Sequence, residues 1–142
     1  PDDFEVPFGK ARIRRPGEDM SIITYGNTTH LCLNVAERLQ KEHDRNVEVI
    51  DIRSLIPLDK DTIFESVKKT SKVLIVHEDK VFSGFGAEIA SIIGSELFRY
   101  LDAPIQRVGS IFTPVGFHPV LEKAILPDEK KIYKAAKELL DY

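Results

Sequence analysis

The sequence predicts an α/β domain built on a parallel sheet with crossover helices. Four short apolar runs are rich in Ile and Val, and each is separated from the next by a stretch with helical periodicity. Strands that alternate with helices in this way are typical of parallel sheets, because each crossover helix returns the chain to the same edge. The predicted strands are Ser21–Tyr25, Val47–Ile52, Val73–His77 and Ile105–Val108.

Residues 1–17 differ in composition from the rest of the chain. They are rich in Pro, Gly and charged residues, with one short alternating patch at Ala11–Arg14. We interpret 1–17 as an interdomain linker with an edge strand, and 18–142 as the compact domain. Because the sequence starts at Pro1 without an initiator Met or a signal peptide, we expect it to be a piece of a longer protein.

Three amphipathic stretches predict helices. The first runs from Thr28 to Glu42, the second begins after Asp59, which is a good N-cap residue, and the last runs from Glu129 to Leu140. Their apolar stripes predict buried side chains at Cys32, Val35, Ala36, Leu39, Ile63, Val67, Ile132, Ala135, Ala136, Leu139 and Leu140.

A further predicted helix, from Gly86 to Leu101, has a wide apolar face. Its apolar residues cover about half of the circumference, whereas docking on one sheet needs only roughly 100°. The extra width predicts that this helix also meets a second protein surface, and Ile92 lies on that face.

The composition excludes several classes of function. The net charge is -3, and Lys and Arg are scattered, so the sequence predicts no nucleic-acid surface. The longest apolar runs are far too short to span a membrane. Cys32 is the single cysteine, and no Cys/His cluster has the spacing of metal ligands. We therefore expect a reducing compartment and no metal site.

The segment GFG at 84–86 lies between a predicted strand and a predicted helix, as a phosphate-binding loop does. Its spacing disfavours a nucleotide site, because the dinucleotide fingerprint needs a third small residue where this chain has Ile89. The lysine of a phosphate loop is also missing. Asp51 lies at the end of a predicted strand, as a ribose-binding acid does. The turn after the first predicted strand, however, has only one glycine, Gly26, where the fingerprint needs several. A nicotinamide site therefore loses its main support.

Other candidate catalytic groups have little support. His77 and Glu78 would be an acid/base pair only if both side chains faced one site, and neighbours on a strand point to opposite faces. Ser83 lacks the nucleophile elbow of hydrolases. The loop Thr113–Pro119 is rigid, and loops of this kind usually position other groups. These residues favour a domain that presents a surface over one that carries out chemistry.

Several blocks of sequence, taken in order, resemble the C-terminal domain of the transketolase superfamily. The resemblance is closest to the β subunit of the thiamin-diphosphate-dependent first component of 2-oxo acid dehydrogenase complexes. It runs from about Pro7 to Tyr142, and its most specific blocks are IDIRSLIPLD at 50–59 and HE at 77–78 followed by GFGAEIA at 84–90. The other matching blocks are DMSIITYG, VHE, DAP, RVG, TP, LE and LP.

The resemblance implies a three-layer αβα sandwich around a five-stranded, mostly parallel sheet, with Ala11–Arg14 as an antiparallel edge strand. It also implies a holoenzyme that oxidatively decarboxylates pyruvate or a branched-chain 2-oxo acid with thiamin diphosphate and magnesium, and reductively acylates a lipoyl group. None of the family's cofactor contacts maps onto this domain. We therefore assign it no catalytic, cofactor-binding or metal-binding residue.

The tasks implied for this domain are assembly with an α subunit and a second β subunit, and docking of the acyltransferase component. Asp102 and the terminal carboxylate of Tyr142 are the expected anchor for an arginine of the acyltransferase's peripheral-subunit-binding domain, because two acceptors suit a bidentate guanidinium. The expected location is a bacterial cytoplasm or the mitochondrial matrix. The other predicted interface residues are His77, Glu78, Gly84, Phe85, Gly86 and Ile92.

Two alternatives stay open. One is the C-terminal domain of a transketolase or a deoxyxylulose-phosphate synthase. The DAP block at 102–104 and the short last helix fit the β subunit better than this alternative. The other, with less support, is an independent dinucleotide-binding domain. The chain departs from the commoner family pattern at Asp79, Ser83 and Gly116, so the shapes of two loops are expected to differ. We expect other domains of the enzyme to set the identity of the 2-oxo acid.

Overall fold

A five-stranded sheet forms the middle of the computed structural model, which describes residues 5–142. The strand order is β1-β3-β2-β4-β5, with β1 antiparallel to β3 and all other neighbours parallel. The predicted mixed sheet with an antiparallel edge strand is therefore confirmed, while the first four residues of the predicted linker lie outside the described part. The strands are β1 (Arg12–Arg15), β2 (Met20–Thr24), β3 (Val47–Asp51), β4 (Val73–Lys80) and β5 (Gln106–Ser110).

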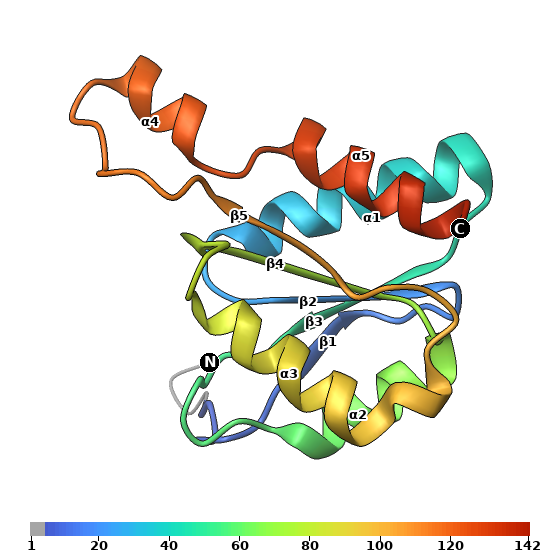
Figure 1. Ribbon diagram of the computed structural model, residues 1–142. Helices are drawn as coiled ribbons and strands as arrows, with labels where there is room; N and C mark the ends of the chain where they lie inside the picture. Colours follow the sequence, from blue (N-terminus) through green and yellow to red (C-terminus); the bar gives the residue numbers. More distant parts are fainter. Residues whose placement is uncertain (1–4) are drawn as a thin grey trace.

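Helices cover both faces of this sheet (Figure 1). The helices α1 and α5 lie together on one face, and α2 and α3 lie on the other, which confirms the three-layer αβα sandwich. The short helix α4 extends away from the sandwich beyond the end of β5. The helices are α1 (Thr28–His43), α2 (Lys60–Thr70), α3 (Phe85–Leu97), α4 (Pro119–Ile125) and α5 (Glu129–Leu140), with a 3₁₀ turn η1 (Phe98–Tyr100).

The sheet separates two apolar cores. One fills the space beneath α1 and α5 and includes Met20 and Leu39, and the other lies beneath α2 and α3 and includes Ile75 and Ile93. Every residue of β2 is buried, because helices cover both faces of the strand. This double cover explains why the strands are unbroken apolar runs rather than alternating ones.

Asp59 caps α2, as the sequence predicts. One of its carboxylate oxygens accepts a hydrogen bond from the backbone N–H of Thr62 at 3.3 Å. The other accepts from the backbone N–H of Ala11 at 3.0 Å. The same side chain therefore begins a helix and fastens the segment that leads into β1.

The predicted helix Gly86–Leu101 differs from the observed one at its end. The α-helix stops at Leu97, and η1 follows with a tighter turn. Tyr100 and Leu101 pack against the same core as Ile93. Part of the predicted width of the apolar face thus comes from residues that are not on the α-helix and that pack partly against the chain's own core.

A charged group is buried on β3. The Glu48 carboxylate accepts hydrogen bonds from Ser66 Oγ and Lys69 Nζ, each at 2.5 Å, and from the backbone N–H of Gly17 at 3.3 Å. Its side chain is 1% exposed. These bonds join β3 to α2 and compensate for the removal of the carboxylate from water.

Candidate protein-docking site

The N-terminus of α3 shows whether the segment at 84–86 is a phosphate cradle. The carboxylate of Asp79 accepts a hydrogen bond from the backbone N–H of Phe85 at 3.3 Å, so an acidic side chain already occupies the end of the helix that would attract an anion. Gly84 is required for another reason, since a Cβ there would lie 2.1 Å from the carbonyl oxygen of Lys80. Gly84 thus serves a tight turn, and Gly86 serves the close approach of α3 to His77, since a Cβ there would lie 2.1 Å from His77 Nε2.

His77 is fully buried beneath this turn. Its ring stacks on Tyr25, with centroids 5.9 Å apart and planes 4° apart, and neither ring nitrogen has a hydrogen-bond partner within residues 5–142. Burial lowers the pKa of His77, which the nearby Asp79 carboxylate only partly offsets. Glu78 is exposed on the other side of the strand, so these two residues do not form the acid/base pair considered from the sequence.

The predicted interface residues differ in exposure. Asp102, Tyr142 and Glu78 are exposed, and Phe85 and Ile92 are partly buried. The three remaining residues, His77, Gly84 and Gly86, are buried within the chain. Their contribution to any interface is therefore to hold the turn before α3 in place from beneath.

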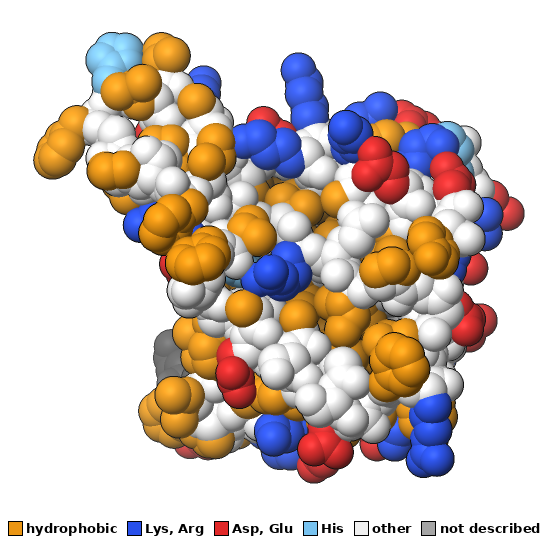
Figure 2. Space-filling view, viewed as in Figure 1, with side chains coloured by type: hydrophobic (Ala, Val, Ile, Leu, Met, Phe, Trp, Pro, Cys, Tyr) orange, Lys and Arg blue, Asp and Glu red, His pale blue; other side chains and the backbone are white. Residues whose placement is uncertain are grey.

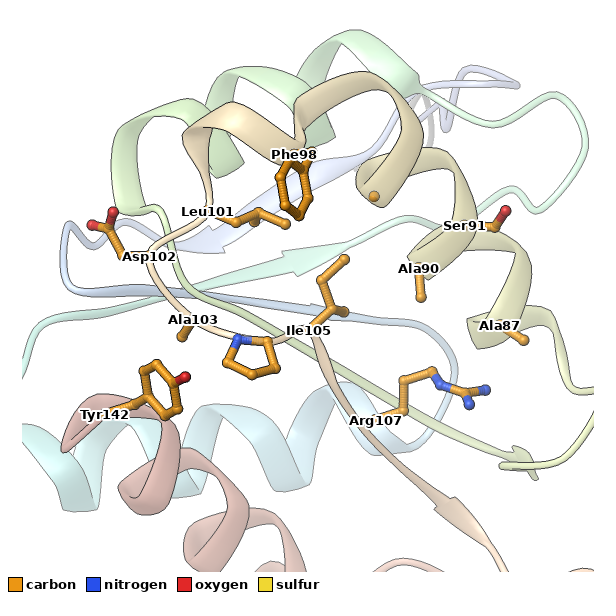
Figure 3. Close-up of a pocket in the computed structure, with 12 residues that line it drawn as sticks. Ala87, Ala90, Ser91, Phe98, Leu101, Asp102, Ala103, Ile105, Arg107 and Tyr142 are labelled. Carbon is orange, nitrogen blue, oxygen red and sulfur yellow. The ribbon is translucent and has the colours of Figure 1, made fainter.

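Asp102 and Tyr142 line one groove, although they come from different elements. The groove has a volume of about 740 Å³ and runs between α3 and the segment that leads into β5. Figure 3 shows Asp102 and Tyr142 at one end of it and Arg107 at the other, with Phe98 and Ile105 between them. The two residues that the resemblance pairs thus line the same groove, although the Asp102 carboxylate points away from the Tyr142 side chain.

Sequence reasoning missed Arg107 and Phe98 as groove residues. Arg107 donates a hydrogen bond from a guanidinium nitrogen to the carbonyl oxygen of Val81 at 2.7 Å, which joins β5 to the turn after β4. Phe98 is 77% exposed, although it follows directly after the buried Leu97. Phe98 lies one helical turn beyond Gly94 and two turns beyond Ser91, so it continues the side of α3 that lines the groove.

A second exposed apolar surface is the segment 111–121, which we call the apolar arm. It follows β5, contains the Pro/Gly-rich loop and leads into α4, which buries none of its own side chains. Phe82 extends this surface, since its ring lies 4.8 Å from that of Phe112. Figure 2 shows apolar side chains gathered over this projecting part. The exposed large apolar residues of the arm are Ile111, Phe112, Val115, Phe117, Val120 and Leu121.

Residues 5–142 have neither a metal-binding cluster nor a membrane-spanning helix. No group of three or more His, Cys, Asp or Glu side chains in this part of the chain is arranged to hold a metal ion. No helix in the same part is long and apolar enough to cross a membrane.

Comparison with known proteins identifies a family. The family described as "Transketolase, C-terminal domain" matches residues 9–132. The "Pyruvate dehydrogenase E1 component subunit beta" of Rickettsia felis is 45% identical over 137 residues, which cover 96% of this chain and 42% of that protein. The "2-oxoisovalerate dehydrogenase subunit beta" of Bacillus subtilis is 39% identical over 142 residues, covering 99% of this chain and 43% of that protein.

A solved structure shares the fold. A "Split gene transketolase, inactive beta4 tetramer" superposes with a TM-score of 0.82 and 24% identity, covering 98% of this chain and 44% of that one. The chain therefore spans less than half the length of the relatives that it matches.

Proposed function

The chain belongs to the transketolase C-terminal domain family, and we propose that it is the C-terminal assembly and docking domain of a 2-oxo acid dehydrogenase β subunit. The relatives quoted above carry names of pyruvate and 2-oxoisovalerate dehydrogenases, so the proposed parent enzyme acts on pyruvate or a branched-chain 2-oxo acid. Its proposed partners are an α subunit, a second β subunit and the acyltransferase component. Its proposed location is a bacterial cytoplasm or the mitochondrial matrix.

One observation carries this proposal. The described surface offers two exposed apolar regions, the groove beside α3 and the apolar arm. Contiguous exposed apolar surface on this scale marks contact with another protein. An assembly domain needs such surfaces, whereas an independent enzyme domain needs converging catalytic groups.

The described residues do not fit thiamin diphosphate. The helix N-terminus that would hold a phosphate is occupied by Asp79, and residues 5–142 contain no arranged cluster of metal ligands. The proposed enzyme would therefore bind thiamin diphosphate and magnesium outside this domain. The same observation disfavours the alternative of an independent dinucleotide-binding domain.

The groove supplies the residues that we propose for binding the acyltransferase component. Asp102 is exposed at the rim, and Tyr142 lies at the same end. An arginine of the acyltransferase's peripheral-subunit-binding domain would form a charge-assisted hydrogen bond with the Asp102 carboxylate. Because this carboxylate is exposed, each such bond should contribute about 1–2 kcal/mol, which is less than for a fully desolvated pair.

The test is to measure binding of that subunit-binding domain to the assembled enzyme by calorimetry. Asp102→Asn should weaken binding about 5- to 30-fold, and added salt should weaken it further because exposed charges are screened. Glu96→Gln is a matched control, since Glu96 is an exposed acid on α3 that does not line the groove. Equal affinities for wild type and both variants would rule out Asp102 as the anchor.

A further inference from the structure

The strand β1 lies at one edge of the sheet and is paired on one side only. Its neighbour is β3, and no other strand within residues 5–142 pairs with it. The groove beside α3 lies along β5, which is the strand at the opposite edge. Backbone N–H and C=O groups on the free side of an edge strand can pair with a further strand. The strand β1 therefore offers a place for an added strand that is separate from the groove.

The side chains along this edge are basic. Four of the six residues from Lys10 to Arg15 are Lys or Arg, and none is acidic. Lys10, Arg12 and Arg14 are exposed, and Ile13 between them is 46% exposed. A strand added at this edge would therefore lie beside a row of positive charges with one apolar side chain among them.

Arg12 and Arg15 differ in what their charges do within the chain. The Arg15 guanidinium donates hydrogen bonds to Asn46 Oδ1 at 3.0 Å and to the carbonyl oxygen of Val47 at 2.5 Å. These bonds hold the end of β1 against the start of β3. Arg12, in contrast, makes no side-chain hydrogen bond or ion pair with the described part of the chain, so its guanidinium is available to a partner.

The other two basic residues have only distant acids beside them. Lys10 Nζ lies 3.9 Å from a carboxylate oxygen of Asp59, and a guanidinium nitrogen of Arg14 lies 3.8 Å from a carboxylate oxygen of Asp51. Both distances exceed the roughly 2.7–2.9 Å of a charge-assisted hydrogen bond. The donors of Lys10 and Arg14 can therefore turn to a closer carboxylate without breaking a hydrogen bond.

We propose that β1 binds an acidic peptide in an extended conformation, which adds to the sheet as a further strand. Backbone hydrogen bonds to the free edge would supply affinity, and carboxylates opposite Arg12 and its basic neighbours would select the sequence. A second copy of β1 is excluded as the occupant, since two basic strands side by side repel each other. Basic side chains protect an edge against neutral and basic strands, so an acidic strand is the one that they admit.

The experiment measures binding of a fluorescent peptide in which glutamate and valine alternate over about eight residues, within the length of an ordinary strand. Fluorescence anisotropy at low salt gives its dissociation constant for the chain. A second peptide, in which glutamate alternates with proline, carries the same charge but cannot form a ladder, because proline has no N–H to donate. It should bind about tenfold more weakly or worse, because those backbone hydrogen bonds are lost.

Two variants and a second readout test the role of β1 itself. Arg12→Glu should weaken binding of the glutamate–valine peptide about tenfold or more, because an attraction becomes a repulsion. Lys130→Glu makes the same change of charge at an exposed position on α5 and should leave the affinity unchanged. The backbone amides of β1 should also exchange with deuterium more slowly when the peptide is bound.

Several results would overturn the inference. They are an absence of binding by the glutamate–valine peptide, equal binding of the proline peptide, and equal binding by wild type and Arg12→Glu. Equal affinity for a single-stranded oligonucleotide of the same charge would also overturn it, because β1 would then attract any polyanion. None of these results depends on Asp102 or on the groove, so they leave the proposed assembly and docking function unaffected.

Discussion

Gly86→Ala should destabilise the chain through one identifiable clash. Gly86 lies in the first turn of α3, directly above the buried imidazole of His77. A Cβ at this position would lie 2.1 Å from His77 Nε2 and 2.4 Å from His77 Cδ2. The ring cannot move aside freely, because Tyr25 stacks on it. Either α3 or the strand β4 must therefore shift.

The expected cost follows from measurements on overpacked cores. An inserted methyl group that displaces packed neighbours typically costs about 1–3 kcal/mol, and the distances here place this variant near the upper end. For a chain of this length, that cost corresponds to a fall in melting temperature of about 5–10 °C. Thermal unfolding followed by circular dichroism measures it. Gly94→Ala is the matched control, since it makes the same exchange in the same helix with open space around it.

A double-mutant cycle with His77→Ala tests the cause. His77→Ala alone should destabilise the chain, because it leaves a cavity beside Tyr25. In that background Gly86→Ala should cost little, since the atoms that it meets have gone, and only Ile75 Cγ2 at 3.2 Å remains close. The coupling free energy should be about 2 kcal/mol. The reasoning fails if Gly86→Ala melts like wild type, or if its penalty is the same with and without the imidazole.

Two further predictions concern buried polar groups. Burial lowers the pKa of His77 below its ordinary 6.5, so at mildly acidic pH the unfolded chain binds a proton that the folded chain does not. The free energy of unfolding should therefore fall as the pH drops below about 6.5. Urea unfolding between about pH 7.5 and 5 should show this loss of stability in wild type and a smaller loss in His77→Gln. Equal pH dependences in the two proteins would show that His77 is not the group responsible. Glu48→Ala should cost about 2–3 kcal/mol, because it leaves Ser66 and Lys69 without their buried acceptor. Denaturant unfolding measures that cost, and Glu65→Ala, at an exposed position on α2, should be nearly neutral.

The layers of the fold were predictable because the local sequence pattern of each strand and helix matches its burial in the folded chain. The run Val73–His77 is apolar because helices cover both faces of the sheet, so the strand could be located from composition alone. Asp59 could be identified as a cap because its side chain satisfies a backbone N–H that any helix start exposes. The resemblance supplied the antiparallel edge strand, which a short alternating basic patch indicates only weakly.

The candidate site was less predictable, because its residues meet through tertiary structure. Arg107 lies on a strand, and nothing in its neighbours along the sequence indicates that its guanidinium reaches the carbonyl oxygen of Val81 and lines a groove. Glu48 is similar, since its burial depends on Ser66 and Lys69, about 20 residues away in sequence. The wide face predicted for the third helix was wrong in part, because helical periodicity assumes an α-helix where the chain turns into η1 at Phe98.

The edge of the sheet that binds ligands in many α/β proteins is filled by the chain's own side chains in this one. Open parallel sheets bind ligands where the direction of strand connection reverses, which is between the carboxyl ends of β2 and β4 in this strand order. Here the stacked rings of Tyr25 and His77 fill that point, and Asp79 occupies the adjoining helix N-terminus. The space is thus closed by the chain's own side chains. The same edge continues from β5 into the exposed apolar arm, which agrees with the proposed role in protein contact.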